Sequence, residues 1–343
     1  MTPADLSRTV LGAVRRAVEE GALHAPVPER IRVERPRPGG RGDYATNVAL
    51  RLAGPAGRQA RDVAEAIRSR IAGSPGIARV EITGPGFLNF TLGADPAAGL
   101  VRTIGERGLE YGHGTALSGV RFGFAPVREL RARVITETVV RLLGAQGAAA
   151  AVEPDGRERI TALPARDDAV FERAGRDAAL WALLRPAAHD QPLPAAALLV
   201  QKEPNALFRV RYAYSRSRAL VRAAGRLGIP VSYEPDVSGL CDADGGALVS
   251  SAAGGAGSSA LLAALGDHPA VLESAARLRA PDRLARHLEA TADALLGLQH
   301  TVLPVGDEKP SAAHRSRLAL AEAAGTVLAG GLALLGISAP EHL

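Results

Sequence analysis

The chain opens with apolar residues at helical spacing. The stretch starts at Thr2-Pro3 and stops at Gly21, which are typical helix start and end residues. The pattern predicts a helix over residues 2–21, and a second apolar stripe predicts another helix around 60–72. The stripes consist of Leu6, Val10, Val14 and Val18, and of Val63, Ile67 and Ile71.

Alternation of apolar and polar residues follows. In 77–82 and again in 87–92 every second residue is apolar, and the intervening Thr83-Gly84-Pro85-Gly86 is a turn sequence. We expect two strands joined by this turn, and a shorter strand at Ile31-Arg32-Val33. These elements predict a small α+β domain that ends near residue 110.

The pattern of apolar residues in the rest of the chain predicts a mixed strand and helix segment and then a helical one. Strand patterns at 120–124 and 148–152 flank a helical pattern at 127–143, which predicts one βαβ unit, and a further helix is expected around 171–184. From 203 onward the pattern is helical. We expect a long helix over 203–228, helix starts at Asp267-His268-Pro269 and Ala280-Pro281-Asp282, and a flexible Gly-, Ser- and Ala-rich insertion at 230–260. The last helix has an apolar seam typical of helical bundles, made of Leu318, Ala321, Gly325, Leu328, Leu332 and Leu335.

Composition narrows the function only slightly. Hydrophobic residues make up 47% of the 343 residues but aromatics only 3%, so an aliphatic, mostly helical core is expected. The net charge of +5, carried almost wholly by arginine, suits a polyanionic partner such as nucleic acid. A genomic bias toward Ala, Gly and Arg would give the same balance, so charge alone leaves both explanations open.

Several chemistries are excluded. A single cysteine, Cys241, rules out an internal disulfide and a thiolate-rich zinc site, and fits a reducing cytoplasm. Charged residues throughout 1–20 argue against a signal peptide, and no apolar run approaches the roughly 20 residues that span a bilayer. The sequence has no P-loop, no paired-histidine metal spacing and no nucleophile elbow. We therefore expect no metal, no cofactor and no membrane.

Three regions carry residues suited to RNA. Phe87 and Asn89 face away from the apolar side of their strand, where a ring can stack on a base and an amide can read its edge; a rim phenylalanine is the alternative. Arg30, Arg32, Arg35, Arg37 and Arg41 form a basic loop that suits phosphate contact or is simply solvated. On the 203–228 helix, aromatic and basic residues interleave, which suits stacking with phosphate contact or a solvated basic face. They are Arg209, Arg211, Tyr212, Tyr214, Arg216 and Arg218.

Blocks at 42–47, 84–90, 211–216 and 335–343 resemble, in the same order, blocks of class I arginyl-tRNA synthetases. The resemblance implies that Phe87 and Asn89 contact a base in the tRNA D-loop, and that 211–216 helps to bind the anticodon loop. Tyr212 and Arg216 match the family there. Arg211 and Tyr214 do not, and Leu343 stands where the family ends in methionine, so the anticodon preference stays open. Asp43 and Asn47 are expected to be turn and cap residues.

The catalytic middle departs from the family. After the first catalytic strand the family carries a His-x-Gly-His signature that holds ATP phosphates at a helix start, but residues 124–130 contain no histidine. The family's lysine loop is missing too, because residues 155–175 contain no lysine, and His113 is expected to be an ordinary loop histidine. Residues 113–190 are therefore predicted to be a degenerate remnant of an α/β Rossmann-type catalytic domain.

The sequence thus predicts three parts: an α+β tRNA-binding domain at 1–112, the remnant at 113–190, and an all-α DALR-type anticodon-binding bundle at 191–343. The leading hypothesis is a truncated, cytoplasmic paralogue that binds tRNA, expected to be arginine tRNA, without activating an amino acid. Two alternatives are an enzyme, either a divergent ligase or one that transfers arginine from charged tRNA, and a protein-interaction module that has lost RNA binding. The expected tRNA contacts are Phe87, Asn89, Arg35, Arg37, Arg41, Arg209, Tyr212, Arg216 and Leu343.

Overall fold

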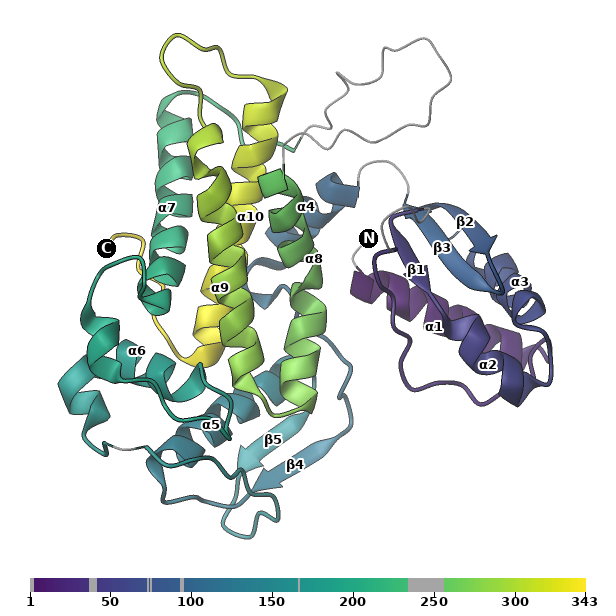
Figure 1. The fold of residues 1–343 in the computed structure, drawn as a ribbon, viewed down its shortest axis with the longest axis horizontal. Helices are drawn as coiled ribbons and strands as arrows, with labels where there is room; N and C mark the ends of the chain where they lie inside the picture. Colours follow the sequence, from purple (N-terminus) through teal and green to yellow (C-terminus); the bar gives the residue numbers. More distant parts are fainter. Residues whose placement is uncertain are drawn as a thin grey trace. The chain divides into compact units, whose positions relative to one another are not determined.

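The structure is a computed structural model, and it describes residues 3–36, 42–72, 74, 76–92, 96–165, 167–233 and 256–343 (Figure 1). The chain divides into two compact units, Met1–Leu100 and Val101–Leu343, with helix α4 (Pro96–Arg107) running across the division. The boundary lies earlier than the predicted end of the first domain near 110. The predicted insertion at 230–260 lies largely outside the described residues.

The first unit is a three-stranded antiparallel sheet with helices packed on it, in the strand order β1-β3-β2. The buried core contains the stripes of the two predicted helices, with Val18 partly buried against it, together with Leu88, Phe90 and Leu92 of the central strand. These two helices and the two predicted strands are confirmed. The elements are α1 (Pro3–Glu19), β1 (Tyr44–Thr46), α2 (Val48–Ala56), α3 (Ala60–Ile71), β2 (Ile77–Thr83) and β3 (Phe87–Leu92).

The predicted strand at 31–33 is wrong. Next to it, only Glu34 forms an isolated bridge, to Ala45. The carbonyl of Arg32 instead accepts a hydrogen bond of 2.7 Å from the Thr46 hydroxyl, and the carbonyl of Ile31 accepts one from the Ser7 hydroxyl. The short apolar alternation therefore reflects burial of Ile31 in the core, because the local backbone acceptors are satisfied by side chains and not by a strand ladder.

The second unit begins with a small parallel sheet. β4 (Arg121–Phe124) pairs in parallel with β5 (Ala149–Val152), and α5 (Leu130–Ala145) connects them, so the predicted βαβ unit is confirmed. α6 (Val170–Leu184) follows, with a kink at Gly175, whose φ is 74°. Two single-turn helices, η1 (Gly108–Glu110) and η2 (Ala195–Leu199), precede and follow this region.

Helices α7 to α10 form the bundle that the seam of the last helix predicts. α10 contacts the other three helices, and all six predicted seam residues are buried (Figure 1). At Gly325 a Cβ atom would lie 2.3 Å from the Ser217 hydroxyl oxygen, so the glycine permits the close approach of α7 to α10. The bundle elements are α7 (Ala206–Arg226), α8 (Ala256–Arg277), α9 (Pro281–Leu298), η3 (Gln299–Thr301) and α10 (Ala312–Leu335).

One predicted helix start is wrong. Asp267-His268-Pro269 lies inside α8, whereas α9 does begin at Pro281 as predicted. A proline within a helix removes one backbone donor and leaves the carbonyl four residues earlier without its usual partner. Here that carbonyl, on Leu265, accepts a hydrogen bond of 3.0 Å from the hydroxyl of Tyr111. A contact 154 residues away in sequence thus helps α8 to continue through Pro269.

The expectation that no segment could span a membrane also needs correction. By length and composition alone α10 is able to, with 24 residues and a mean hydropathy of 1.8 in its most apolar window. In this structure 72% of that window is buried, which is how the central helix of a soluble bundle also behaves.

Candidate nucleic-acid interface

The two candidate residues of the first unit differ in exposure. Phe87, at the start of β3, is 40% exposed, whereas Asn89 is only 6% exposed. The Asn89 amide donates a hydrogen bond of 2.7 Å to the hydroxyl of Thr83 on the neighbouring strand. Phe87 therefore offers a ring at the surface, while one N–H of the largely buried Asn89 amide is already used within the sheet. Gly86 precedes them with a φ of 143°, and a Cβ there would lie 2.8 Å from the Ala60 carbonyl oxygen.

The basic loop is only partly described. Arg35 is exposed, and Arg32 is exposed and pairs with Glu34. Arg37 and Arg41 lie outside the described residues. Asp43 occupies a turn position as expected, and its carboxylate accepts a hydrogen bond of 2.8 Å from the Leu92 backbone amide. Asn47 stands at the start of α2 as expected, but its side chain makes no capping hydrogen bond.

In the second unit the candidates lie on one exposed side of α7. Tyr212 is 39% exposed and stacks on Phe208, with ring centroids 5.8 Å apart. Arg209 reaches α9, where its Nε donates to the Asp293 carboxylate at 3.0 Å, and Arg216 donates to the Gln299 amide oxygen at 3.0 Å. Tyr212 thus keeps exposed ring area between two arginines that neighbouring side chains hold in place.

A second stripe of α7 binds the segment after α10. The carboxylate of Glu341 accepts hydrogen bonds from Arg218 at 3.2 Å and from Arg222 at 3.1 Å. Its backbone carbonyl accepts a third from the Ser215 hydroxyl at 2.9 Å. Leu343, two residues further on, is 49% exposed. The expectation that the last residues lie near the candidates on α7 is confirmed for Glu341.

The same segment is anchored at its start to α6. The backbone amide of Ser338 donates to the Asp177 carboxylate at 3.1 Å, and the Ser338 hydroxyl makes a further bond to that carboxylate. Arg211 of α7 pairs with Asp177 at 3.7 Å. Sequence reasoning missed these contacts. The one available signal was the spacing of Arg211, Ser215, Arg218 and Arg222, which places the four residues on one helix face.

At the start of α5 a carboxylate caps the helix. The Glu129 side chain accepts hydrogen bonds from the backbone amides of Arg131, at 3.0 Å, and Ala132, at 2.6 Å. Burial raises the pKa of Glu129, but these bonds and one from Ala165 outweigh it, so the pKa is lowered and the carboxylate is ionised.

Arg131 is fully buried beside this cap. Its guanidinium donates to five backbone carbonyls of the segment that follows β5, at 2.6–3.1 Å. Burial lowers the pKa of Arg131, an effect that nearby carboxylates, first Glu129, oppose. All five donors have partners within the fold, which gives Arg131 a structural role. The acceptors are the carbonyls of Leu163, Leu183, Pro186, Ala187 and Asp190.

Three histidines lie close together in the second unit, and this cluster was not predicted from the sequence. His268 stacks on Tyr111 at 5.8 Å and lies 5.2 Å from the ring of His287. Burial lowers the pKa of His287 to about 4, and burial, then the charges of His287 and His113, lowers the pKa of His268 well below its ordinary value. His113, expected to be an ordinary loop histidine, has a buried Nε2 that finds no hydrogen-bond partner among the residues the structure describes. Across the described part of the chain, no group of three or more His, Cys, Asp or Glu side chains is arranged to hold a metal ion.

Comparison with known families gives a match at each end of the chain. Residues 6–92 match the family described as "Arginyl tRNA synthetase N terminal domain". Residues 210–343, which include Tyr212 and the segment bound to α7, match the "DALR anticodon binding domain". The chain carries an arginyl-tRNA synthetase N-terminal domain and a DALR anticodon-binding domain.

Curated relatives are similar in sequence to this chain over part of their length. An arginine–tRNA ligase of Frankia alni is 43% identical over 157 residues, which are 43% of this chain and 28% of that protein. An arginine–tRNA ligase of Micrococcus luteus is 41% identical over 163 residues, covering 43% of this chain and 29% of that protein. The matched part is under a third of the length of these relatives.

Solved structures share the fold. The arginyl-tRNA synthetase of Thermus thermophilus superimposes with a TM-score of 0.66 at 12% identity, covering 100% of both chains. The enzyme of Plasmodium falciparum gives a TM-score of 0.57 at 10% identity, covering 99% of both chains. The homology to arginine–tRNA ligases is therefore partial in sequence and is accompanied by a common architecture.

Proposed function

We propose that this chain binds tRNA, with arginine-accepting tRNA as the expected partner, and does not activate an amino acid. The observation that carries the proposal is an exposed aromatic residue in each of the two RNA-binding domains, Phe87 in the first and Tyr212 in the second. Exposed rings beside arginines suit stacking on unpaired bases, which is how proteins read single-stranded RNA.

The surroundings of α5 support the absence of activation. ATP phosphates bind at a helix start because exposed amides and the helix dipole attract negative charge. At α5 the Glu129 carboxylate already takes two of these amides and would repel a phosphate. Arg131 cannot compensate, because its five donors serve backbone carbonyls. The cytoplasm is the expected site of action, since that is where such a tRNA partner would be met.

Competition binding tests the RNA part of the proposal. At one fixed salt concentration, unlabelled arginine tRNA should displace labelled arginine tRNA better than a non-arginine tRNA does. Tyr212→Ala should narrow this preference because base stacking carries sequence information, whereas Arg35→Ala should weaken both tRNAs alike. A wild-type protein without affinity for any tRNA would refute the proposal and favour the protein-interaction module.

Two activity assays test the rest. Arginine-dependent ATP–pyrophosphate exchange with added tRNA should stay at background in the pure protein. Transfer of labelled arginine from charged tRNA to protein or small-molecule acceptors should also be absent. Exchange that follows the pure protein would establish a divergent ligase, and transfer would establish an enzyme that uses charged tRNA.

A further inference from the structure

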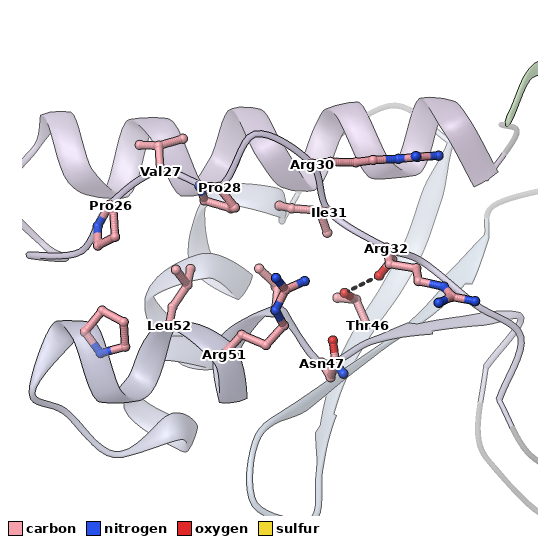
Figure 2. Close-up of a pocket in the computed structure, with 12 residues that line it drawn as sticks. Pro26, Val27, Pro28, Arg30, Ile31, Arg32, Thr46, Asn47, Arg51 and Leu52 are labelled. Atoms are coloured by element: carbon pink, nitrogen blue, oxygen red, sulfur yellow. Dashed lines mark hydrogen bonds between the residues drawn. The ribbon is translucent and has the colours of Figure 1, made fainter. Parts of the chain in front are cut away.

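The first unit contains a pocket that none of the candidate residues above explains. It lies between the irregular segment 26–32 and the start of α2, and its volume is about 200 Å³ (Figure 2). Val27, Ile31 and Leu52 line its apolar part. Pockets for drug-sized ligands measure roughly 300–1,000 Å³, so this one suits a smaller ligand, about the size of one base with the groups attached to it.

The polar part of the pocket is basic. Arg30, Arg32 and Arg51 are among its lining residues, and the twelve lining residues include no acid. Arg32 is held by Glu34, but the Arg51 side chain makes no hydrogen bond or ion pair with the residues that the structure describes. Figure 2 shows Arg51 between Ile31 and the Thr46–Asn47 backbone. An apolar wall beside an uncommitted guanidinium suits a flat neutral ring joined to a negatively charged group, as the base and phosphate of a nucleotide are.

The pocket lies at the same end of the sheet as Phe87. In the antiparallel pairing of β1 with β3, Thr46 stands opposite Leu88. Asn47, which lines the pocket, follows Thr46, and Phe87 precedes Leu88, so both come at the same end of adjacent strands. Adjacent strands are only about 4.8 Å apart. A single RNA strand crossing this end of the sheet would therefore meet both the ring and the pocket.

We propose that this pocket is a second nucleotide subsite, which takes the base and phosphate of an RNA nucleotide neighbouring the one that stacks on Phe87. The subsite rests on the proposed tRNA binding. Arg51 lies against the face of the base, next to the phosphate of the same nucleotide, and Val27, Ile31 and Leu52 pack against the base. The subsite would fix the register of the RNA on the first unit, because two adjacent unstacked nucleotides would be held together.

The test uses the full-length chain, an arginine tRNA transcript, and a matched arginine outside the pocket. Arg51→Gln should lower affinity about three- to tenfold, whereas Arg61→Gln on the exposed side of α3 should change it less than twofold. Val27→Glu, which places a carboxylate in the pocket, should lower affinity at least as much as Arg51→Gln. All three variants should melt at the wild-type temperature, because the replaced side chains are exposed.

Transcripts with single abasic nucleotides then identify the occupant. One abasic position in the D-loop should lower the affinity of wild-type protein severalfold and leave the affinity of Arg51→Gln unchanged. A neighbouring abasic position should also lower the affinity of wild-type protein, and it should leave the affinity of Phe87→Ala unchanged. Equal effects of Arg51→Gln and Arg61→Gln, or no abasic position coupled to Arg51, would overturn the subsite while Phe87→Ala still weakens binding. A rise in melting temperature with adenosine monophosphate that requires Arg51 would overturn it in favour of a free-nucleotide site. Loss of all tRNA binding by the wild type would instead remove the proposed function.

Discussion

The buried histidines make the second unit sensitive to acid, and His287→Leu isolates this effect. His268 of α8 and His287 of α9 lie ring to ring, close to His113, whose own pKa is lowered chiefly by burial. The nearest charged groups acting on His113 are Glu110 and Arg107. Nε2 of His287 has no hydrogen-bond partner among the described residues, so leucine strands no donor or acceptor there.

The magnitude follows from the shift in pKa. The pKa of His287 falls from 6.5 to about 4 on folding, so the unfolded chain binds a proton more readily. Stability from the neutral histidine is therefore complete above pH 6.5 and is lost as the pH falls toward 4. At about 1.4 kcal/mol per pKa unit, His287 alone should lower the free energy of unfolding by about 2 kcal/mol between pH 7.5 and pH 5. Glu129 does not contribute in this window, because a lowered carboxylate pKa acts only below its ordinary value of 4.5.

Urea unfolding of the full chain at pH 7.5 and pH 5 measures this loss. Wild type should lose about 2 kcal/mol more than His287→Leu over the interval. The exposed His300→Leu provides the control and should lose as much as wild type. If wild type and His287→Leu lose the same amount, the ring of His287 takes up its proton in the folded state, and its burial does not act as described.

Two further predictions concern other contacts. Arg131→Met should lower the free energy of unfolding by at least about 3 kcal/mol, because it leaves five backbone carbonyls, those of Leu183 and Pro186 buried, without their donor. Exposed Arg133→Met should change the free energy of unfolding by under about 0.5 kcal/mol, and similar melting curves for both variants would refute the structural role of Arg131. Glu341→Gln should release Arg218 and Arg222, so it should raise tRNA affinity and steepen the slope of log affinity against log salt concentration by about one unit. Exposed Glu172→Gln is the control, and an unchanged slope in Glu341→Gln would show that these arginines do not contact phosphate.

Most of the fold could be predicted from local patterns of apolar residues in the sequence. The stripe from Leu6 to Val18 and the seam from Leu318 to Leu335 each predicted a helix and its buried face, since burial follows the helical period directly. Pro269 misled because its effect on α8 depends on Tyr111, which is distant in sequence. The strand predicted at 31–33 failed for a similar reason, since distant side chains take its carbonyls.

The candidate interface was less predictable than the fold. Exposure of Phe87 followed from strand alternation, but burial of Asn89 depended on the hydroxyl of Thr83 on the paired strand. The contact between Asp177 and Ser338 spans 161 positions, and nothing near either residue signals it. Such contacts arise only once α6, α7 and the last segment are packed, so sequence periodicity does not encode them.

The most direct test of the central claim is to recover and sequence the RNA that the full-length protein retains when it is purified from cells at moderate salt. Binding through both RNA-binding domains predicts that tRNA dominates this RNA and that arginine-accepting tRNAs are enriched over their share of total tRNA. It also predicts that this enrichment falls in Tyr212→Ala. Retained RNA that mirrors the total RNA of the cell, or no retained RNA at all, would contradict the account.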